Sequence, residues 1–256
     1  VTMQRLYMEK LLIKIIVLIV SSLSLSSLMA DPIETNNDEI INRALQYYLV
    51  ENREELIREH DLISSEYKKN NEAKSLLLSM LFHEFLIADI STKKIKKKYS
   101  KLCITNSKSA LTSSKSEADL YAVLSACYGL SAESNLFKAA SHGTQSGRMI
   151  DKSLVMDSKN AFAYMIKGIG DYTRPSFAGG SKENGNKNLS TALELIDKHD
   201  NSAGDKKFII AIANFHLANI AFITKNKQQA LQYLKNSLRV APDYKRALEL
   251  SKKIES

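Results

Sequence analysis

The sequence predicts an all-α protein built from antiparallel helix pairs. Apolar residues recur at helical spacing along most of the chain, and no segment shows the alternation of apolar and polar residues that is typical of a strand. The 256 residues include only 9 Gly and 3 Pro, which argues against a turn-rich sandwich or barrel. With 44% hydrophobic and 25% charged residues, the chain has the composition of a folded globular protein.

Residues 1–30 have the features of a signal peptide. Lys10 and Lys14 supply positive charge, 15–20 is an unbroken apolar run, and Ala30 is a suitable small residue before a cleavage site. An uncleaved membrane anchor is the alternative, because the 19 residues of 11–29 are just long enough to span a bilayer, although they include Lys14 and several serines. In either case we expect an exported protein, periplasmic or secreted, or anchored to the membrane by this segment.

The chain carries a surplus of positive charge. Removal of residues 1–30 takes away three positive side chains and one negative one, and lowers the formal net charge from +8 to +6. Such a surplus favours anionic surfaces, for example anionic lipid or wall polymers. The one dense cluster consists of Lys93, Lys94, Lys96, Lys97 and Lys98. Because no aromatic side chains are interleaved with it, a solvated helix face is favoured over a nucleic-acid site, and we expect no nucleic-acid partner.

Residues 31–117 are expected to form an N-terminal helical region. Apolar stripes at helical spacing cover 36–112. Breaks between helices are expected at 70–71, 91–92 and 113–116, where runs of Asn, Ser and Thr interrupt the stripes. This region is either a set of degenerate repeats or a separate cap.

The last third of the chain carries the most specific pattern. Leu217 and Ala218 stand side by side, and Ala230 follows twelve residues after Ala218. Leu234 and Pro242 continue the pattern at the spacing of the tetratricopeptide repeat (TPR), a 34-residue pair of antiparallel helices, and the segment resembles this family. The small side chains of Ala218 and Ala230 let the two backbones approach each other. Leu217 and Leu234 are expected to fill the seam.

The resemblance extends upstream to an earlier helix pair. Tyr164 and Gly168 occupy the matching places of a first helix that begins near residue 161, and Leu189 and Ala192 fit its second helix. A further copy begins near residue 118. The resemblance therefore implies TPR-like repeats over 118–256, stacked as an α-solenoid and ended by a capping helix.

The resemblance also implies a candidate binding surface, because the first helix of each pair lines the inner face of the stack, where partners of this family usually bind. The residues expected there are Phe162, Met165, Ile169, Tyr172, Phe215, Asn219 and Phe222. This mostly apolar and aromatic set suits an apolar peptide helix or a hydrophobic small molecule. The alternative, which is favoured, is that residues 36–112 fold back over this face and make it part of the core.

A loop between the helices of the 161 repeat is a second candidate. Pro175 presets one bend, and Gly179 and Gly180 permit backbone angles that other residues resist. Arg174 is placed either to clamp an anionic group or to cap helix carbonyls, and the second, structural role is favoured.

The sequence offers little support for catalysis or metal binding. Its five His residues are scattered, and the segment HEFLI at His83 has Ile87 where a zinc-binding HExxH motif needs its second His. We therefore expect His83 to be a polar residue at the boundary of a helix. Cys103 and Cys127 are either a disulfide between neighbouring helices or two buried small residues, and the second is slightly favoured. We expect no enzymatic activity, no cofactor and no metal.

The expected function is that of a non-catalytic interaction scaffold or assembly factor in the bacterial cell envelope. Its partner would be an unidentified envelope protein or peptide. The alternative is a periplasmic accessory protein of a solute transporter that binds a hydrophobic small molecule, which the apolar side chains of the inner face would equally suit.

Overall fold

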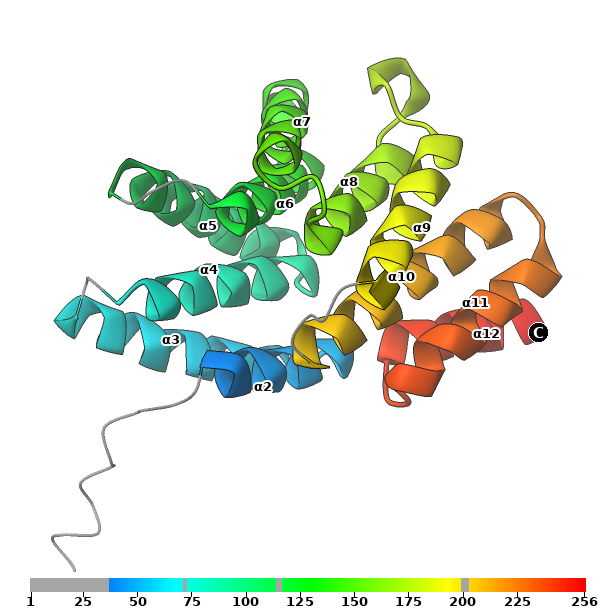
Figure 1. Ribbon diagram of the computed structural model, residues 1–256, viewed down its shortest axis with the longest axis horizontal. Coiled ribbons are helices and arrows are strands. Elements are labelled where there is room, and N and C mark those ends of the chain that lie inside the picture. Colours follow the sequence, from blue (N-terminus) through cyan, green and yellow to red (C-terminus); the bar gives the residue numbers. More distant parts are fainter. Residues whose placement is uncertain (1–36, 71–72, 114–116, 199–202) are drawn as a thin grey trace, which may run out of the picture. The chain divides into compact units, whose positions relative to one another are not determined.

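The computed structural model of the chain describes residues 37–70, 73–113, 117–198 and 203–256 (Figure 1). Residues 37–256 form one compact unit with its own hydrophobic core. The expected signal peptide, residues 1–30, lies outside the described residues.

The described residues form helices joined by turns, with no β-strand among them. The α-helices are α2 (Asn37–Leu49), α3 (Arg53–Lys69), α4 (Lys74–Asp89), α5 (Lys93–Ser113), α6 (Ala118–Ser134), α7 (Ala139–Met156), α8 (Ala161–Thr173), α9 (Lys182–Lys198), α10 (Ala203–Ile223), α11 (Lys227–Val240) and α12 (Lys245–Glu255). Two short 3₁₀ helices, η1 (Leu136–Lys138) and η2 (Ser176–Ala178), lie in the α6–α7 and α8–α9 turns. The all-α prediction is thus confirmed for the part of the chain that the structure describes.

Asparagine side chains define where three of the helices begin. Asn52, Asn160 and Asn226 each accept a hydrogen bond from the backbone N–H three residues later, as N-cap residues do. Asn160 also donates a 2.6 Å hydrogen bond to Asp119, which ties the start of α8 to the first turn of α6. Polar turn residues therefore fix both the ends of the helices and part of their packing.

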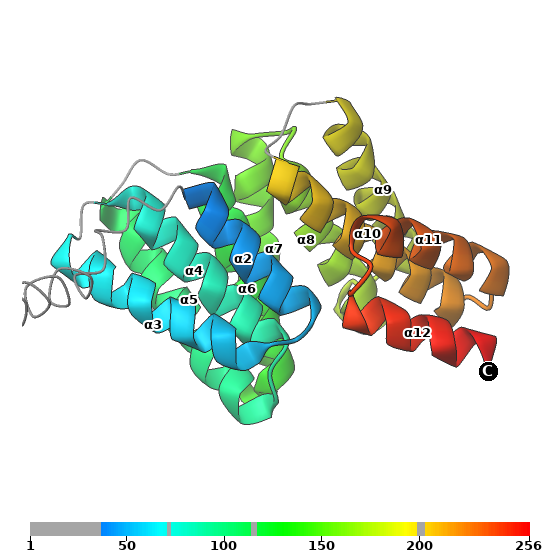
Figure 2. The same ribbon diagram turned by 90° about the horizontal axis from the view of Figure 1, so that it is seen from below.

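Consecutive helices form antiparallel pairs that stack on one another. α6 packs on α7, α8 on α9 and α10 on α11, and the first helices of neighbouring pairs also touch (Figures 1 and 2). The hydroxyl of Ser153 on α7 donates to the carbonyl of Ala118 on α6, and Ser237 on α11 donates to Ala211 on α10, both at 2.7 Å. This is the TPR-like arrangement of helix pairs that the sequence predicts.

Small and aliphatic side chains form the seams within these pairs. Gly168 on α8 lies directly against α9, because a Cβ at this position would be 2.7 Å from Cγ of Leu189. Tyr164 is half-buried beside it. The remaining seam residues are all buried, and they are Leu189, Ala192, Leu217, Ala218, Ala230 and Leu234. Close approach of the helix backbones therefore depends on the absence of larger side chains here.

The helices α2 to α5 continue the stack on its N-terminal side, and they contain an ionic network. Glu59 on α3 lies 3.3 Å from Nε2 of His83 on α4, and Glu84 lies 3.3 Å from Nε2 of His60. Nδ1 of His83 contacts the carbonyl of Ser79 at 2.8 Å. His83 is fully buried, so the expectation of a boundary position was wrong. Its carboxylate partner is on another helix, which the local pattern does not show.

A disulfide joins the N-terminal helices to the repeats. Cys103 on α5 is bonded to Cys127 on α6, with 6.1 Å between their Cα atoms, and both residues are fully buried. The slightly favoured expectation of two unpaired small residues was therefore wrong. Helical spacing places each cysteine on a buried face, but only the packing of α5 against α6 brings the two sulfurs together.

One described helix, α10, is long and apolar enough to cross a membrane by length and composition. Its apolar stretch, Lys206–Ile223, is mostly buried by neighbouring helices. α10 packs against α2, α8, α9, α11 and α12, so its apolar character is explained by its central place in the core.

Candidate functional site

The aromatic stripe on the inner face of the stack is covered by N-terminal helices. The ring of Phe162 on α8 has its centroid 6.1 Å from that of Phe82 and 6.4 Å from that of Phe85, both on α4. Phe82 also contacts Phe208 at the start of α10. Met165 is only 1% exposed. These contacts fit the interpretation in which residues 36–112 fold back over this face.

The C-terminal half of the stripe is covered by α12. The ring of Phe215 packs edge-on against Tyr244, with centroids 5.1 Å apart, and is 9% exposed. Asn219 donates its side-chain amide to the carbonyl of Phe215 within α10, and Lys253 lies over the ring of Phe222. Among the expected groove residues, Phe162, Ile169, Tyr172, Asn219 and Phe222 are half-buried. The stripe therefore packs against α4 at Phe162, against Tyr244 at Phe215 and against α12 at Phe222.

A polar clamp joins the last helix to the first helices. Arg246 on α12 donates to Asp89 at the end of α4 at 2.8 Å and to Glu51 in the α2–α3 turn at 3.1 Å. The hydroxyl of Tyr48 donates to the same Asp89 carboxylate at 2.7 Å. Burial alone would raise the pKa of Asp89, but Arg246 and Tyr48 hold it below its usual value. We call Tyr48, Glu51, Asp89 and Arg246 the closing clamp.

A second polar contact lies beside the clamp. The hydroxyl of Tyr172 and Nδ1 of His216 are hydrogen-bonded at 2.6 Å. Burial raises the pKa of Tyr172 and lowers the pKa of His216 to about 4, so a protonated phenol faces a neutral imidazole. The neighbouring Tyr244 hydroxyl is buried and makes no hydrogen bond within the described residues. This buried contact joins α8 to α10.

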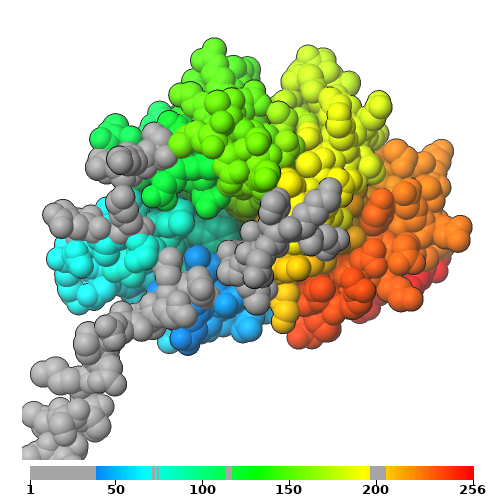
Figure 3. Space-filling model, viewed as in Figure 1, coloured from blue at the N-terminus to red at the C-terminus, as the bar shows by residue number. Residues whose placement is uncertain are grey.

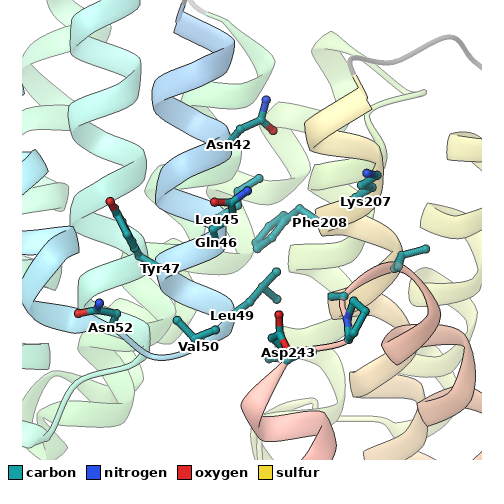
Figure 4. A pocket seen from close by; sticks show the side chains of 14 residues that line it. Asn42, Leu45, Gln46, Tyr47, Leu49, Val50, Asn52, Lys207, Phe208 and Asp243 are labelled. Atoms are coloured by element: carbon teal, nitrogen blue, oxygen red, sulfur yellow. The ribbon is translucent and has the colours of Figure 1, made fainter.

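A cleft opens where α2 faces the last repeat. Its volume is about 850 Å³, and Figure 4 shows side chains from α2 on one side facing α10 and the α11–α12 turn on the other. The lining residues are Asn42, Leu45, Gln46, Tyr47, Leu49, Val50, Asn52, Lys207, Phe208, Val240, Ala241, Pro242, Asp243 and Tyr244. We call this the seam cleft, because it runs between helices from opposite ends of the sequence, which contact one another beside it (Figure 3).

The lining of the seam cleft is chemically mixed. Leu49 and Val50 supply apolar surface, and Phe208 forms an apolar floor. Asn42 and Gln46 on α2 bring amide groups that donate and accept hydrogen bonds. Lys207 and Asp243 supply opposite charges on the far wall. Sequence reasoning missed this site, because Pro242 was the only lining residue singled out, and only as a repeat marker.

The loop with Pro175 has backbone features that account for its glycines. Gly179 has φ +83°, a value that favours glycine, and a Cβ at Gly180 would lie 1.8 Å from the carbonyl oxygen of Arg174. The backbone N–H of Arg174 donates to the carbonyl of Gly170, so this residue ends α8. Pro175 is the N-cap residue of the short helix η2. The described residues contain no group of three or more His, Cys, Asp or Glu side chains placed to hold a metal ion.

Comparisons with known proteins give only a distant structural likeness. No family model matches the chain, and no curated protein matches it. Among solved structures, the chain is similar to YrrB, described as "a TPR protein with an unusual peptide-binding site". The identity is 16% and the TM-score 0.41, over 86% of this chain and 95% of that chain. A likeness this distant identifies no residue or ligand, so the site is argued from its own contacts.

Proposed function

We propose that the protein is an exported, non-catalytic scaffold that binds an extended peptide segment of a cell-envelope partner in the seam cleft. The observation that carries the proposal is the cleft itself, about 850 Å³ in volume and lined by apolar, amide and charged side chains. Helical-repeat stacks offer extended surfaces of this kind for binding. An assembly or adaptor role follows, in which no bond is made or broken.

The chemistry of the lining favours an extended peptide. A peptide backbone carries one donor and one acceptor per residue, and the amides of Asn42 and Gln46 complement both. Leu49 and Phe208 provide surface for an apolar side chain between these polar contacts. Lys207 and Asp243 offer charges of opposite sign, which would select the direction of the bound segment.

The closing clamp supports the proposal because it fixes the walls of the cleft before a ligand arrives. Glu51 follows Val50 at the rim and is held by Arg246 and by Lys245, at 3.1 and 3.0 Å. Glu51 also has a positive φ of 56°, which sets the direction of the α2–α3 turn. A preorganised cleft loses less conformational freedom on binding than a mobile one.

Two observations support export. Residues 1–30 have the sequence features of a signal peptide. The buried disulfide between Cys103 and Cys127 is of a kind that persists in oxidising compartments and is rare in the reducing cytosol. The periplasm or the cell exterior is therefore the proposed location.

Selection of binding peptides tests the function. Residues 31–256 are presented to a displayed random-peptide library, and enriched peptides are titrated by fluorescence anisotropy. Val50→Asp, at the rim of the cleft, is expected to weaken binding about tenfold or more, because it places a charge against apolar contacts. Val155→Asp is the matched control, since Val155 is another exposed valine, on α7 and outside the cleft. No enrichment, or equal loss in both variants, would contradict the proposal.

A hydrophobic small molecule is the second candidate occupant. The cleft volume falls within the range of small-ligand sites, and Leu45, Leu49 and Phe208 supply apolar contacts. Native mass spectrometry of the purified protein distinguishes a bound small molecule from a bound peptide. A bound small molecule that is lost in Val50→Asp and retained in Val155→Asp would replace the peptide as the ligand.

A further inference from the structure

The turns within the helix pairs lie along one edge of the stack. The first helices α4, α6, α8 and α10 contact one another in sequence, and their C-terminal ends lead into the turns at 90–92, 135–138, 174–181 and 224–226. A salt bridge of 2.9 Å between Lys96 on α5 and Glu133 near the end of α6 links the first two of these turns. In the view of Figure 2, the α4–α5 turn lies at the bottom of the molecule. We call these four turns the pair-turn edge.

This edge exposes large apolar side chains at successive turns. Phe137 in η1 is fully exposed at 102% and Phe177 in η2 is 92% exposed. Leu136 is 84% exposed, and Ile223, at the end of α10, is 50% exposed. None of these residues lines the seam cleft. Their high exposure makes them protruding tips.

Positive charge surrounds the apolar tips. Four exposed lysines lie in the first turns of α5, and they are Lys93, Lys94, Lys97 and Lys98. Lys138 follows Phe137, and exposed lysines also flank the two remaining turns, at Lys182, Lys225 and Lys227. Two exposed carboxylates, Glu133 and Glu183, lie among these lysines, and the lysines outnumber them. The described turns on the opposite edge are of mixed charge, with Glu117, Asp157 and Asp243 beside Lys159. The α2–α3 turn, with Glu51 and Glu54, bounds the basic surface.

We propose that the pair-turn edge docks on an anionic lipid bilayer. Aromatic and aliphatic tips on separate turns insert between lipid headgroups, and the lysines beside them are attracted to the negative surface. A protein partner would need a complementary pocket for each separated tip, whereas a bilayer accepts them all at once. This inference is independent of the peptide site, because the seam cleft uses other residues.

Vesicle flotation tests the proposal with residues 31–256, which contain the entire compact unit without the apolar N-terminal stretch. The probes are phosphatidylcholine vesicles with and without phosphatidylglycerol. We expect binding only to the vesicles with phosphatidylglycerol, and weaker binding at high salt, because salt screens exposed charges. Absence of binding to these vesicles, or equal binding to both kinds, would overturn the proposal.

Matched variants locate the surface. Phe137→Ser with Phe177→Ser is expected to reduce binding about tenfold or more, and Val155→Ser, which removes an exposed apolar side chain elsewhere, is expected to have no effect.

Charge variants form the second comparison. A triple variant, Lys93→Gln, Lys94→Gln and Lys97→Gln, is compared with an equal charge change at exposed positions off the edge, Lys159→Gln, Lys235→Gln and Lys252→Gln. Only the first is expected to lose binding about tenfold or more. Equal loss in both sets would mean nonspecific attraction and would overturn the assignment to this edge. Circular dichroism confirms that each variant remains folded.

Discussion

The guanidinium of Arg246 lies 2.8 Å from the carboxylate of Asp89, a residue 157 positions earlier in the chain. This contact joins the last helix, α12, to the end of α4, and Glu51 in the α2–α3 turn completes it. α2 and α4 are thereby held against the C-terminal repeat. The seam cleft lies beside this closure, so the same contacts that cover the inner face also create the proposed site.

Removal of the Arg246 side chain is expected to destabilise the closure. Arg246→Met should lower the free energy of unfolding by about 2 kcal/mol, because Asp89 would lose its main cationic partner while remaining largely shielded from water. A double-mutant cycle with Asp89→Asn, measured by denaturant unfolding, gives the interaction free energy between Arg246 and Asp89. Additive effects of the two substitutions would show that the contact does not couple the ends of the chain.

Phe215→Asp tests whether the aromatic stripe is core or open surface. Phe215 is 9% exposed and packs against Tyr244, so the charged substitute would lose apolar burial and place an ion among rings. We expect a loss of stability of about 3 kcal/mol or more, seen as a large fall in Tm. Asn219→Asp, on the half-buried part of α10, is the control with a smaller expected effect. An unchanged Tm for Phe215→Asp would mean that the stripe is open.

The α8–α9 seam predicts opposite effects for two glycine substitutions. Gly168→Ala should destabilise the protein by about 1–3 kcal/mol, because the new Cβ would lie 2.7 Å from Leu189 and the helices would have to separate. Gly147→Ala, in the middle of α7 with no atom within 4 Å, should stabilise it by about 0.5–1 kcal/mol. Thermal unfolding measures both. Stabilisation by both changes would show that α8 and α9 do not approach each other closely at Gly168.

Reduction of the disulfide is expected to weaken the fold. Cys103 and Cys127 are 24 residues apart, and a crosslink of this length contributes about 3 kcal/mol in the chain-entropy model. Thermal unfolding with and without a reductant should show a lower Tm for the reduced protein. A Cys103→Ala, Cys127→Ala variant should be insensitive to the reductant. Free thiols in protein purified from an oxidising compartment would contradict the pairing.

The buried histidine His60 gives stability a defined dependence on pH. Burial lowers its pKa, but Glu84 and Asp61 outweigh this effect, and the folded pKa is raised above 6.5. The stabilisation is therefore complete below pH 6.5 and is lost as the pH rises through the folded value. The ring of Tyr99 also packs edge-on against the ring of His60.

Unfolding measured from about pH 6 to about pH 9 checks this dependence, because the pKa of folded His60 lies above 6.5. His60→Gln should remove the decline in stability with rising pH. His142→Gln should leave it in place, because burial lowers the pKa of His142 and its titration lies on the acid side. An identical decline in wild type and His60→Gln would assign it to other groups.

The features that were predictable from sequence are those fixed by neighbouring residues. The seam residues Leu217, Ala218, Ala230 and Leu234 follow local spacing, and the helix breaks near 70–71 and 91–92 follow runs of polar residues, so the all-α class and the pairing of helices could be anticipated. The same spacing cannot tell an inner face that is open from one that is covered. The spacing of Phe162 is compatible with an open inner face and with a covered one. Only the contacts of Phe162 with Phe82 and Phe85 decide between the two.

The candidate site was beyond the reach of sequence reasoning for a related reason. Gln46 and Asp243 line one cleft although nearly the whole domain separates them along the chain. His83 and Glu59 are likewise paired through the packing of α3 on α4. Contacts of this kind depend on how the stack curves, which the period of the apolar residues does not encode.

The most direct test of the account compares the seam cleft with the inner face as the place of binding. A peptide selected on residues 31–256 is titrated by fluorescence anisotropy against wild type, Val50→Asp in the cleft and Asn219→Asp on the inner face. We expect about a tenfold or greater increase in Kd for Val50→Asp and little change for Asn219→Asp. Loss of binding in Asn219→Asp, with Val50→Asp unaffected, would contradict it and return the site to the inner face.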